Sequence, residues 1–156
     1  MQPHVDVLTL AVRDLDASRR FYVDGLKWVT TLDVPGEVIF IQIGHGLLMG
    51  LYDAGKFAAE TGIDEPATAA PMSLGHNVHS VEEVEAVLAQ AETAGGTIIS
   101  PARQMSWGGC SGYFADPDGF RWEVAFNPGL TVDQDGTVRI GVIEDADQAN
   151  QADHSH

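Results

Sequence analysis

One pattern of strands and a helix occurs twice in this sequence, and this repeat limits the possible folds more than any other feature. In each half a strand runs into a helix cap and then into the first apolar residue of a helix. The matching segments are Val12-Arg13-Asp14-Leu15 and Val78-His79-Ser80-Val81. Such self-similarity indicates two copies of one supersecondary unit. We therefore expect an α+β fold built from two tandem βαβββ units.

Apolar periodicity and turn residues predict the elements of each unit. In unit one, about 5–52, strands are expected over 5–12, 27–32, 37–43 and 47–52, and a helix over 14–24 capped by Asp14. In unit two, about 72–128, strands are expected over 72–79, 97–100, 112–115 and 120–126, and a helix over 81–94. Ser80 and Glu83 form a capping box at the start of the second helix.

The remaining segments are expected to lie outside the two units. Residues 53–71 are interpreted as a linker with a short helix over 56–60, because Gly, Pro and Ala interrupt the periodic pattern. Residues 129–142 are expected to form a C-terminal hairpin extension. Residues 143–156 are polar and acidic without a period, which predicts a disordered tail.

A tight turn near the end of unit two joins two aromatic-rich strands. In Asp116-Pro117-Asp118-Gly119, the proline presets φ, both carboxylates can accept from nearby backbone amides, and the glycine tolerates positive φ. The strand that follows carries one carboxylate, Glu123, among apolar neighbours. A glutamate in that position faces either water or a polar cavity.

Composition excludes several classes of function. The net charge of −15 argues against nucleic acid and anionic membranes as partners, and it is compatible with a cationic ligand or simply with solubility. The single cysteine, Cys110, excludes an internal disulfide framework and suits a reducing cytoplasm. The first residues lack the basic and apolar regions of a signal peptide, and no apolar run approaches the length of a membrane span. We therefore expect a cytoplasmic protein.

Two motifs carry a family resemblance. They are Ala11-Val12-Arg13-Asp14-Leu15-Asp16-Ala17-Ser18-Arg19-Arg20-Phe21-Tyr22, followed by Gly25-Leu26, and Tyr113-Phe114-Ala115-Asp116-Pro117-Asp118-Gly119, followed by Trp122-Glu123. Over residues 5–128 the chain resembles the vicinal oxygen chelate superfamily, the glyoxalase, bleomycin-resistance and extradiol-dioxygenase fold. The resemblance implies cup-shaped mixed sheets, a domain over about 1–128, and a homodimer in which a two-fold axis completes or supports each cup.

The resemblance also indicates where a metal would be held. Metal-dependent members place one ligand on the first and one on the last strand of each unit. By offset from the helix caps these positions fall at Val7, at Met49 or Gly50, at Ser73 and at Glu123. Glu123 is the one common ligand type among them, whereas a catalytic divalent metal generally needs three or more. We expect no metal and no other cofactor.

Strand parity predicts which side chains line the cup. Thr9, Ser73 and Asn77 share a face on the opening strands, and Arg121 and Glu123 point the same way on the closing strand. Trp107 is expected at the mouth of the cup and Tyr113 beside it. The odd spacing of His76 from Ser73 puts it on the opposite face, under the helix, unless a bulge turns it inward as a metal ligand. Trp28 is interpreted as a core residue.

Three functions remain open at this point. The first is a metal-independent protein that binds a small aromatic or cationic molecule, as drug-sequestering resistance proteins do. The second is a metal-dependent lyase or isomerase similar to lactoylglutathione lyase, with Glu123 as the catalytic base. The third is a structural or partner-binding module whose cup is filled by its own side chains. Glu123 could equally be a structural carboxylate bonded to Ser73, Thr9 or Arg121.

Overall fold

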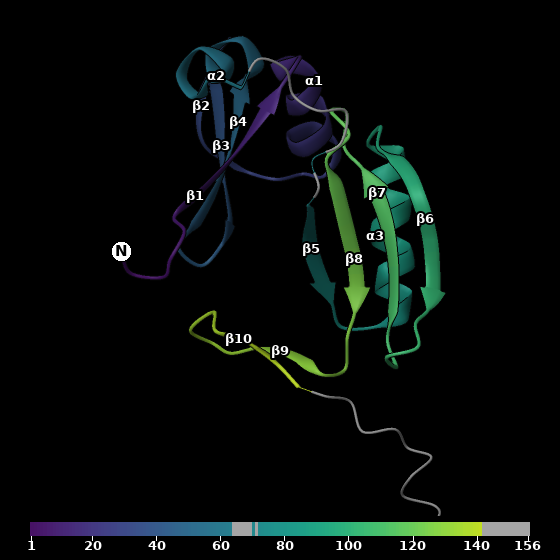
Figure 1. Ribbon diagram of the computed structural model, residues 1–156. Coiled ribbons are helices and arrows are strands. Elements are labelled where there is room, and N and C mark those ends of the chain that lie inside the picture. The colour runs from purple at the N-terminus through teal and green to yellow at the C-terminus, as the bar shows by residue number, and fades with distance from the viewer. Residues whose placement is uncertain (64–69, 71, 142–156) are drawn as a thin grey trace, which may run out of the picture.

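The computed structural model describes residues 1–63, 70 and 72–141, and it contains two four-stranded sheets that lie side by side (Figure 1). Unit one contains β1 (Val7–Val12), α1 (Leu15–Arg19), the π-helix η1 (Arg20–Gly25), β2 (Thr30–Val34), β3 (Val38–Gly44) and β4 (Leu47–Asp53). Helix α2 (Ala54–Thr61) follows. Unit two contains β5 (Ser73–Val78), α3 (Val81–Thr93), β6 (Thr97–Gln104), β7 (Cys110–Ala115) and β8 (Arg121–Phe126).

The two sheets have the same topology. Their strand orders are β1-β4-β3-β2 and β5-β8-β7-β6. In each sheet the first strand pairs parallel with the last strand, and the other pairs are antiparallel. This confirms the predicted α+β fold with two βαβββ units and mixed sheets.

Both helix starts form as the sequence predicts. The Asp14 carboxylate accepts from the backbone N–H groups of Asp16 and Ala17 at 2.9 and 3.1 Å. Ser80 Oγ accepts from the Glu83 N–H at 3.2 Å, and Glu83 reaches back to accept from the His79 N–H at 2.9 Å. These bonds satisfy backbone donors that the first turn of a helix leaves free.

The first helix ends at Gly25, next to the predicted residue 24, but its second half is not α-helical. The helix does not continue regularly to residue 24, because α1 passes into the π-helix at Arg20. The wider turn lets two consecutive aromatic residues, Phe21 and Tyr22, both be fully buried. Lys27 then adopts a left-handed conformation with φ 64°, so β2 begins at Thr30 and not at residue 27.

Two strands of unit two are longer than predicted. Strand β6 extends to Gln104 through Pro101, because it is an edge strand with register shifts and an edge tolerates a residue without an N–H donor. Strand β7 begins at Cys110 and not at residue 112, and Cys110 and Ser111 are buried. In the linker, the short helix is α2, capped by the Asp53 carboxylate. The predicted tail and residues 64–69 and 71 lie outside the described residues.

The Asp116–Gly119 turn joins the two units. The Asp116 carboxylate accepts from the local Asp118 and Phe120 N–H groups, as the sequence predicts, and Gly119 has φ 88°. Each aspartate also accepts from unit one. The Tyr22 hydroxyl donates to Asp116 Oδ2 at 2.6 Å, and the Arg13 N–H donates to Asp118 Oδ1 at 2.9 Å. The turn therefore holds the first helix of unit one against unit two.

A C-terminal hairpin of β9 (Leu130–Val132) and β10 (Val138–Ile140) runs beneath both units (Figure 1). At its turn, Gly136 lies so close to His45 that an added Cβ would be 2.7 Å from the His45 Cβ. The hairpin extends from the end of β8 to the β3–β4 turn, so it spans both units. No described helix is long and apolar enough to cross a membrane.

Candidate functional site

Strand register places most of the predicted site residues on one face of unit two. Glu123 pairs with Gly75 and Tyr113, and its neighbours along the same face are Arg121 and Ala125. Ser73 pairs with Arg121, and Asn77 pairs with Ala125. Paired residues in a sheet project to the same side, and α3 covers the other side (Figure 1). The helix-free face of unit two therefore carries Ser73, Asn77, Tyr113, Arg121 and Glu123.

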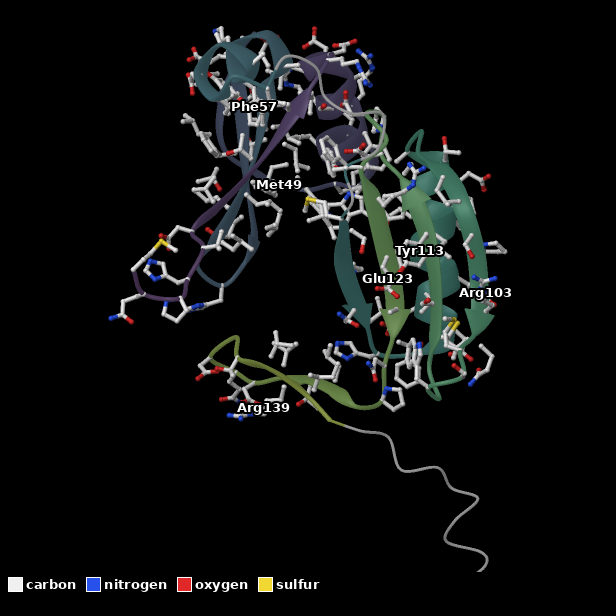
Figure 2. All side chains as sticks on the ribbon, viewed as in Figure 1. Met49, Phe57, Arg103, Tyr113, Glu123 and Arg139 are labelled. Atoms are coloured by element: carbon white, nitrogen blue, oxygen red, sulfur yellow. The ribbon has the colours of Figure 1, made fainter. Side chains whose placement is uncertain are left out.

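The centre of this face is a tyrosine–glutamate pair on adjacent strands. Figure 2 shows Tyr113 and Glu123 next to each other in front of the ribbon. Burial, the charge of Glu123 and a hydrogen bond to Glu123 together raise the pKa of the Tyr113 hydroxyl. The phenol is therefore a donor to the carboxylate at neutral pH. A ligand with its own N–H or O–H can take the place of that donor or share the carboxylate with it.

Arg121 and Trp107, two other predicted site residues, contact groups other than Glu123. The Arg121 guanidinium donates to the Gly119 carbonyl at 2.8 Å. The Trp107 ring lies over Gly109, where any Cβ would collide with it, and Trp107 is 36% exposed. Trp107 thus sits on the β6–β7 connector at the end of the sheet where β8 finishes, with one side open to solvent.

Thr9 lies in a separate pocket between α2 and the face of unit one opposite α1. This cavity, of about 320 Å³, is lined by Thr9, Val38, Phe40, Tyr52, Phe57, Glu60 and Thr61. The Tyr52 hydroxyl donates to Glu60 at 2.7 Å, and this bond is the main reason that the pKa of Tyr52 rises to about 12. All the lining residues belong to unit one and α2. Glu123 is not among the residues that line the Thr9 pocket.

The two units differ at the centre of this face. Glu123 pairs with Gly75, the third residue of β5, and Gly50 pairs with Thr9, the third residue of β1. Gly50, and not Met49, is therefore the counterpart of Glu123. Met49 points to the helix side and is fully buried. A Cβ added at Gly50 would lie 3.0 Å from the Phe40 ring, so the phenylalanine occupies the space of a longer side chain.

Comparison with known proteins agrees with this architecture. The model of the glyoxalase/bleomycin resistance protein/dioxygenase superfamily matches residues 4–124. The chain belongs to this superfamily. No curated protein matches the sequence.

Among solved structures, the chain is similar to a glyoxalase-related enzyme from Fulvimarina pelagi. The two are 36% identical over 90% of this chain and 99% of that chain, with a TM-score of 0.82. A superfamily protein from Nocardioides is 25% identical, with a TM-score of 0.67 over 81% of this chain and 84% of its own. Lactoylglutathione lyase from Agrobacterium tumefaciens is 22% identical, with a TM-score of 0.60 over 81% and 95%. The last similarity shows the fold alone.

The donor set of this superfamily member does not fit a catalytic metal. The positions that the family resemblance assigns to metal ligands carry Val7, Gly50, Ser73 and Glu123, and Phe40 fills the space beside Gly50. Within the part of the chain that the structure describes, no three His, Cys, Asp or Glu side chains lie close enough to hold one ion. One carboxylate cannot fix the coordination geometry of a divalent metal by itself.

The structure keeps His76 on the side that strand parity predicts, and it corrects the interpretation of Trp28. The β5–β8 register has no bulge, so His76 stays on the face of Trp122 and Val124, the helix side. Trp28 is not purely a core residue, because it lines a cavity between the units together with His76 and Trp122. Sequence reasoning missed this role. The tryptophan lies just after the left-handed Lys27, and the local pattern gives no sign of the neighbouring unit.

Proposed function

We propose that this superfamily member binds a small aromatic or cationic molecule on the helix-free face of unit two, without a metal held by the protein. Glu123 is the charged acceptor for the ligand, and Tyr113 exchanges its hydrogen bond with the ligand's donor group. One observation carries the proposal. Glu123 stands at the centre of the face of unit two, whereas the equivalent position in unit one is Gly50, and the Phe40 ring occupies the space beside it.

The surroundings of Glu123 support a cationic ligand. Arg121, the nearest positive group along the strand, donates to the Gly119 carbonyl, and Glu123 interacts with the neutral Tyr113. The chain as a whole carries a net charge of −15, which attracts cations to any of its faces. A hydrogen bond between a charged donor and the Glu123 carboxylate is worth about 1.5–3 kcal/mol.

We further propose that a second copy of the chain completes the site. Val7 and Leu32, on the face of unit one opposite α1, are 43% and 52% exposed, although both are large and apolar. A homodimer that lays this face over unit two would cover them and would bring Thr9 of one chain toward Glu123 of its partner. The absence of a disulfide-forming pair and the single buried thiol of Cys110 suit a cytoplasmic setting.

The alternative is lyase or isomerase chemistry with Glu123 as the base. Support for it is limited to the position of Glu123 and to the fold shared with lactoylglutathione lyase. The mismatch of the donor set weighs against the metal that such chemistry uses in the family. Metal-independent binding is therefore the function that the geometry supports best.

Calorimetric titration with benzylammonium, and with benzoate as the probe of opposite charge, tests the proposal. Glu123→Gln keeps the side-chain shape and one acceptor oxygen, and it should weaken benzylammonium binding about tenfold or more. The matched control is Glu92→Gln, which makes the same change in net charge on α3, the helix that covers the opposite side of the sheet. The control should bind as the wild type does. Equal affinities in all three proteins, or tighter binding of benzoate, would refute the proposal.

A further inference from the structure

A cavity of about 750 Å³ lies between the two units and reaches the edge strand β5, where Ser73 and Gly75 belong to its lining. Unit two contributes Leu74, His76 and Trp122, which project to the helix side of the sheet in the register of β5 and β8. Unit one contributes Trp28 and the end of the β3–β4 hairpin, including Leu47. Neighbouring residues on a strand face opposite sides of the sheet, so Trp122 lines this cavity and Glu123 does not.

The aromatic wall of this inter-unit cavity is held in place by hydrogen bonds. The rings of Trp28 and Trp122 meet edge to face, with centroids 5.6 Å apart. The Trp122 indole N–H donates to the Tyr22 hydroxyl at 3.1 Å, and that hydroxyl donates to Asp116. The polar atom of Trp122 is thus engaged, and its ring presents a fixed apolar surface. A wall that is already ordered costs a ligand little conformational entropy on binding.

The charge of the lining distinguishes this cavity from the rest of the molecule. Charged residues make up 20% of the chain, yet no Asp, Glu, Lys or Arg lines the cavity. A charged ligand would lose hydration there without gaining an opposite charge. The lining therefore favours a neutral molecule, and the volume lies in the range of sites that enclose drug-sized ligands.

His76 is the polar group best placed to orient such a molecule. It lines this cavity together with Trp28 and Trp122, and the same three residues line a smaller cavity that continues toward Val87 of α3. Although His76 lies on the exposed edge strand, burial around its ring lowers its pKa. A neutral imidazole offers one donor and one acceptor at pH 7, which suits a hydroxyl group.

We propose that the inter-unit cavity is a second binding site, which takes a neutral aromatic molecule with one hydroxyl or similar polar group. The aromatic part of the ligand packs against Trp28 and Trp122, and His76 hydrogen-bonds its polar group. This site differs from the one proposed for Glu123, because Tyr113, Arg121 and Glu123 do not line it, although Ser73 and Gly75 of the edge strand β5 do.

Equilibrium dialysis with 1-naphthol and with naphthalene tests the role of His76. His76→Ala should weaken 1-naphthol binding about threefold to tenfold, since one hydrogen bond is lost, and should leave naphthalene binding unchanged. The matched control is His79→Ala, three residues along, where the exposed imidazole lies outside the cavity. The control should bind both probes as the wild type does.

A second variant blocks the cavity itself. Leu47→Trp adds bulk at its partly exposed rim and should abolish binding of both probes, whereas Glu123→Gln should change neither. Retained affinity for 1-naphthol in either His76→Ala or Leu47→Trp overturns the proposal, as does absence of binding to the wild type. A parallel loss in Glu123→Gln would place the probe on the other face and also overturns it. A change from dimer to monomer in Leu47→Trp, seen by light scattering, would make the cavity an interface between copies instead.

Discussion

Gly50 and Glu123 occupy equivalent positions in the two units, and their side chains explain why the two faces differ. In unit one, the Phe40 ring lies over Gly50, and the nearest carboxylate, Glu60, comes from α2 and is bonded to Tyr52. In unit two, the carboxylate comes from β8 itself and is bonded to Tyr113. Each face therefore has a tyrosine–glutamate pair. Only in unit two does the carboxylate stand at the strand position to which the family resemblance assigns a metal ligand.

Trp107 is predicted to add a flat contact surface for the ligand of Glu123. Trp107→Ala should weaken benzylammonium binding about twofold to thirtyfold, because a cation–π contact contributes about 0.5–2 kcal/mol. Ile99→Ala is a suitable control, since Ile99 is an exposed apolar residue of the neighbouring strand β6. Calorimetry on both variants decides the point. Unchanged affinity in Trp107→Ala would remove the tryptophan from the site.

Tyr22 links two buried polar groups, so its hydroxyl should matter for stability. Tyr22→Phe removes the donor to Asp116 Oδ2 and the acceptor of the Trp122 N–H, while Asp116 Oδ1 keeps its two backbone donors. We expect the free energy of unfolding to fall by about 1–3 kcal/mol, measured by urea denaturation. Tyr113→Phe removes a hydroxyl from a more exposed site and should cost less. A similar fall in the free energy of unfolding in both variants would contradict the stabilising role of the Tyr22 hydrogen bonds between the units.

Among the elements, the Asp116–Gly119 turn has the clearest dependence on pH. Burial raises the pKa of Asp116 to about 6, although the hydroxyl of Tyr22 opposes the shift. A carboxyl whose pKa is higher in the folded state stabilises the fold below its unfolded pKa of 3.8 and loses that contribution as the pH rises through about 6. Because one pKa unit corresponds to about 1.4 kcal/mol, the change amounts to about 3 kcal/mol.

Asp116→Asn removes this titration and keeps the shape of the side chain. Urea denaturation at pH 4 and pH 7 should show the variant gaining stability relative to the wild type as the pH rises, by about 1–3 kcal/mol. Subtracting the two proteins cancels the other carboxylates. A difference that stays constant from pH 4 to pH 7 would show that Asp116 does not carry the raised pKa.

The elements also show how far local sequence patterns determine this fold. The caps at Asp14 and Ser80 and the turn at Gly119 act through bonds within a few residues, so their sequences predict them. Strand parity correctly assigns Ser73 and Glu123 to one face, because side chains alternate wherever the register has no bulge. The π-helix and the role of Trp28 in the inter-unit cavity depend on contacts between the units, and a local pattern carries no information about those contacts.

For the whole molecule, the predicted assembly follows from the exposed apolar side chains of unit one. Light scattering at micromolar concentration should give twice the chain mass of 16.7 kDa. Leu32→Glu should reduce this to the mass of one chain, because it places a charge within the proposed contact. Glu82→Lys, a charge change on α3, is the control and should stay dimeric. A wild-type protein with the mass of one chain would exclude the homodimer.

The central claim is that binding at the Glu123 face needs no metal held by the protein. The most direct test is elemental analysis of protein purified without chelator. Because Val7, Gly50 and Ser73 stand where ligands would be needed, we expect zinc, nickel, iron and manganese each to be far below one atom per chain. A content near one atom of any of these metals per chain would contradict the claim and favour the lyase alternative.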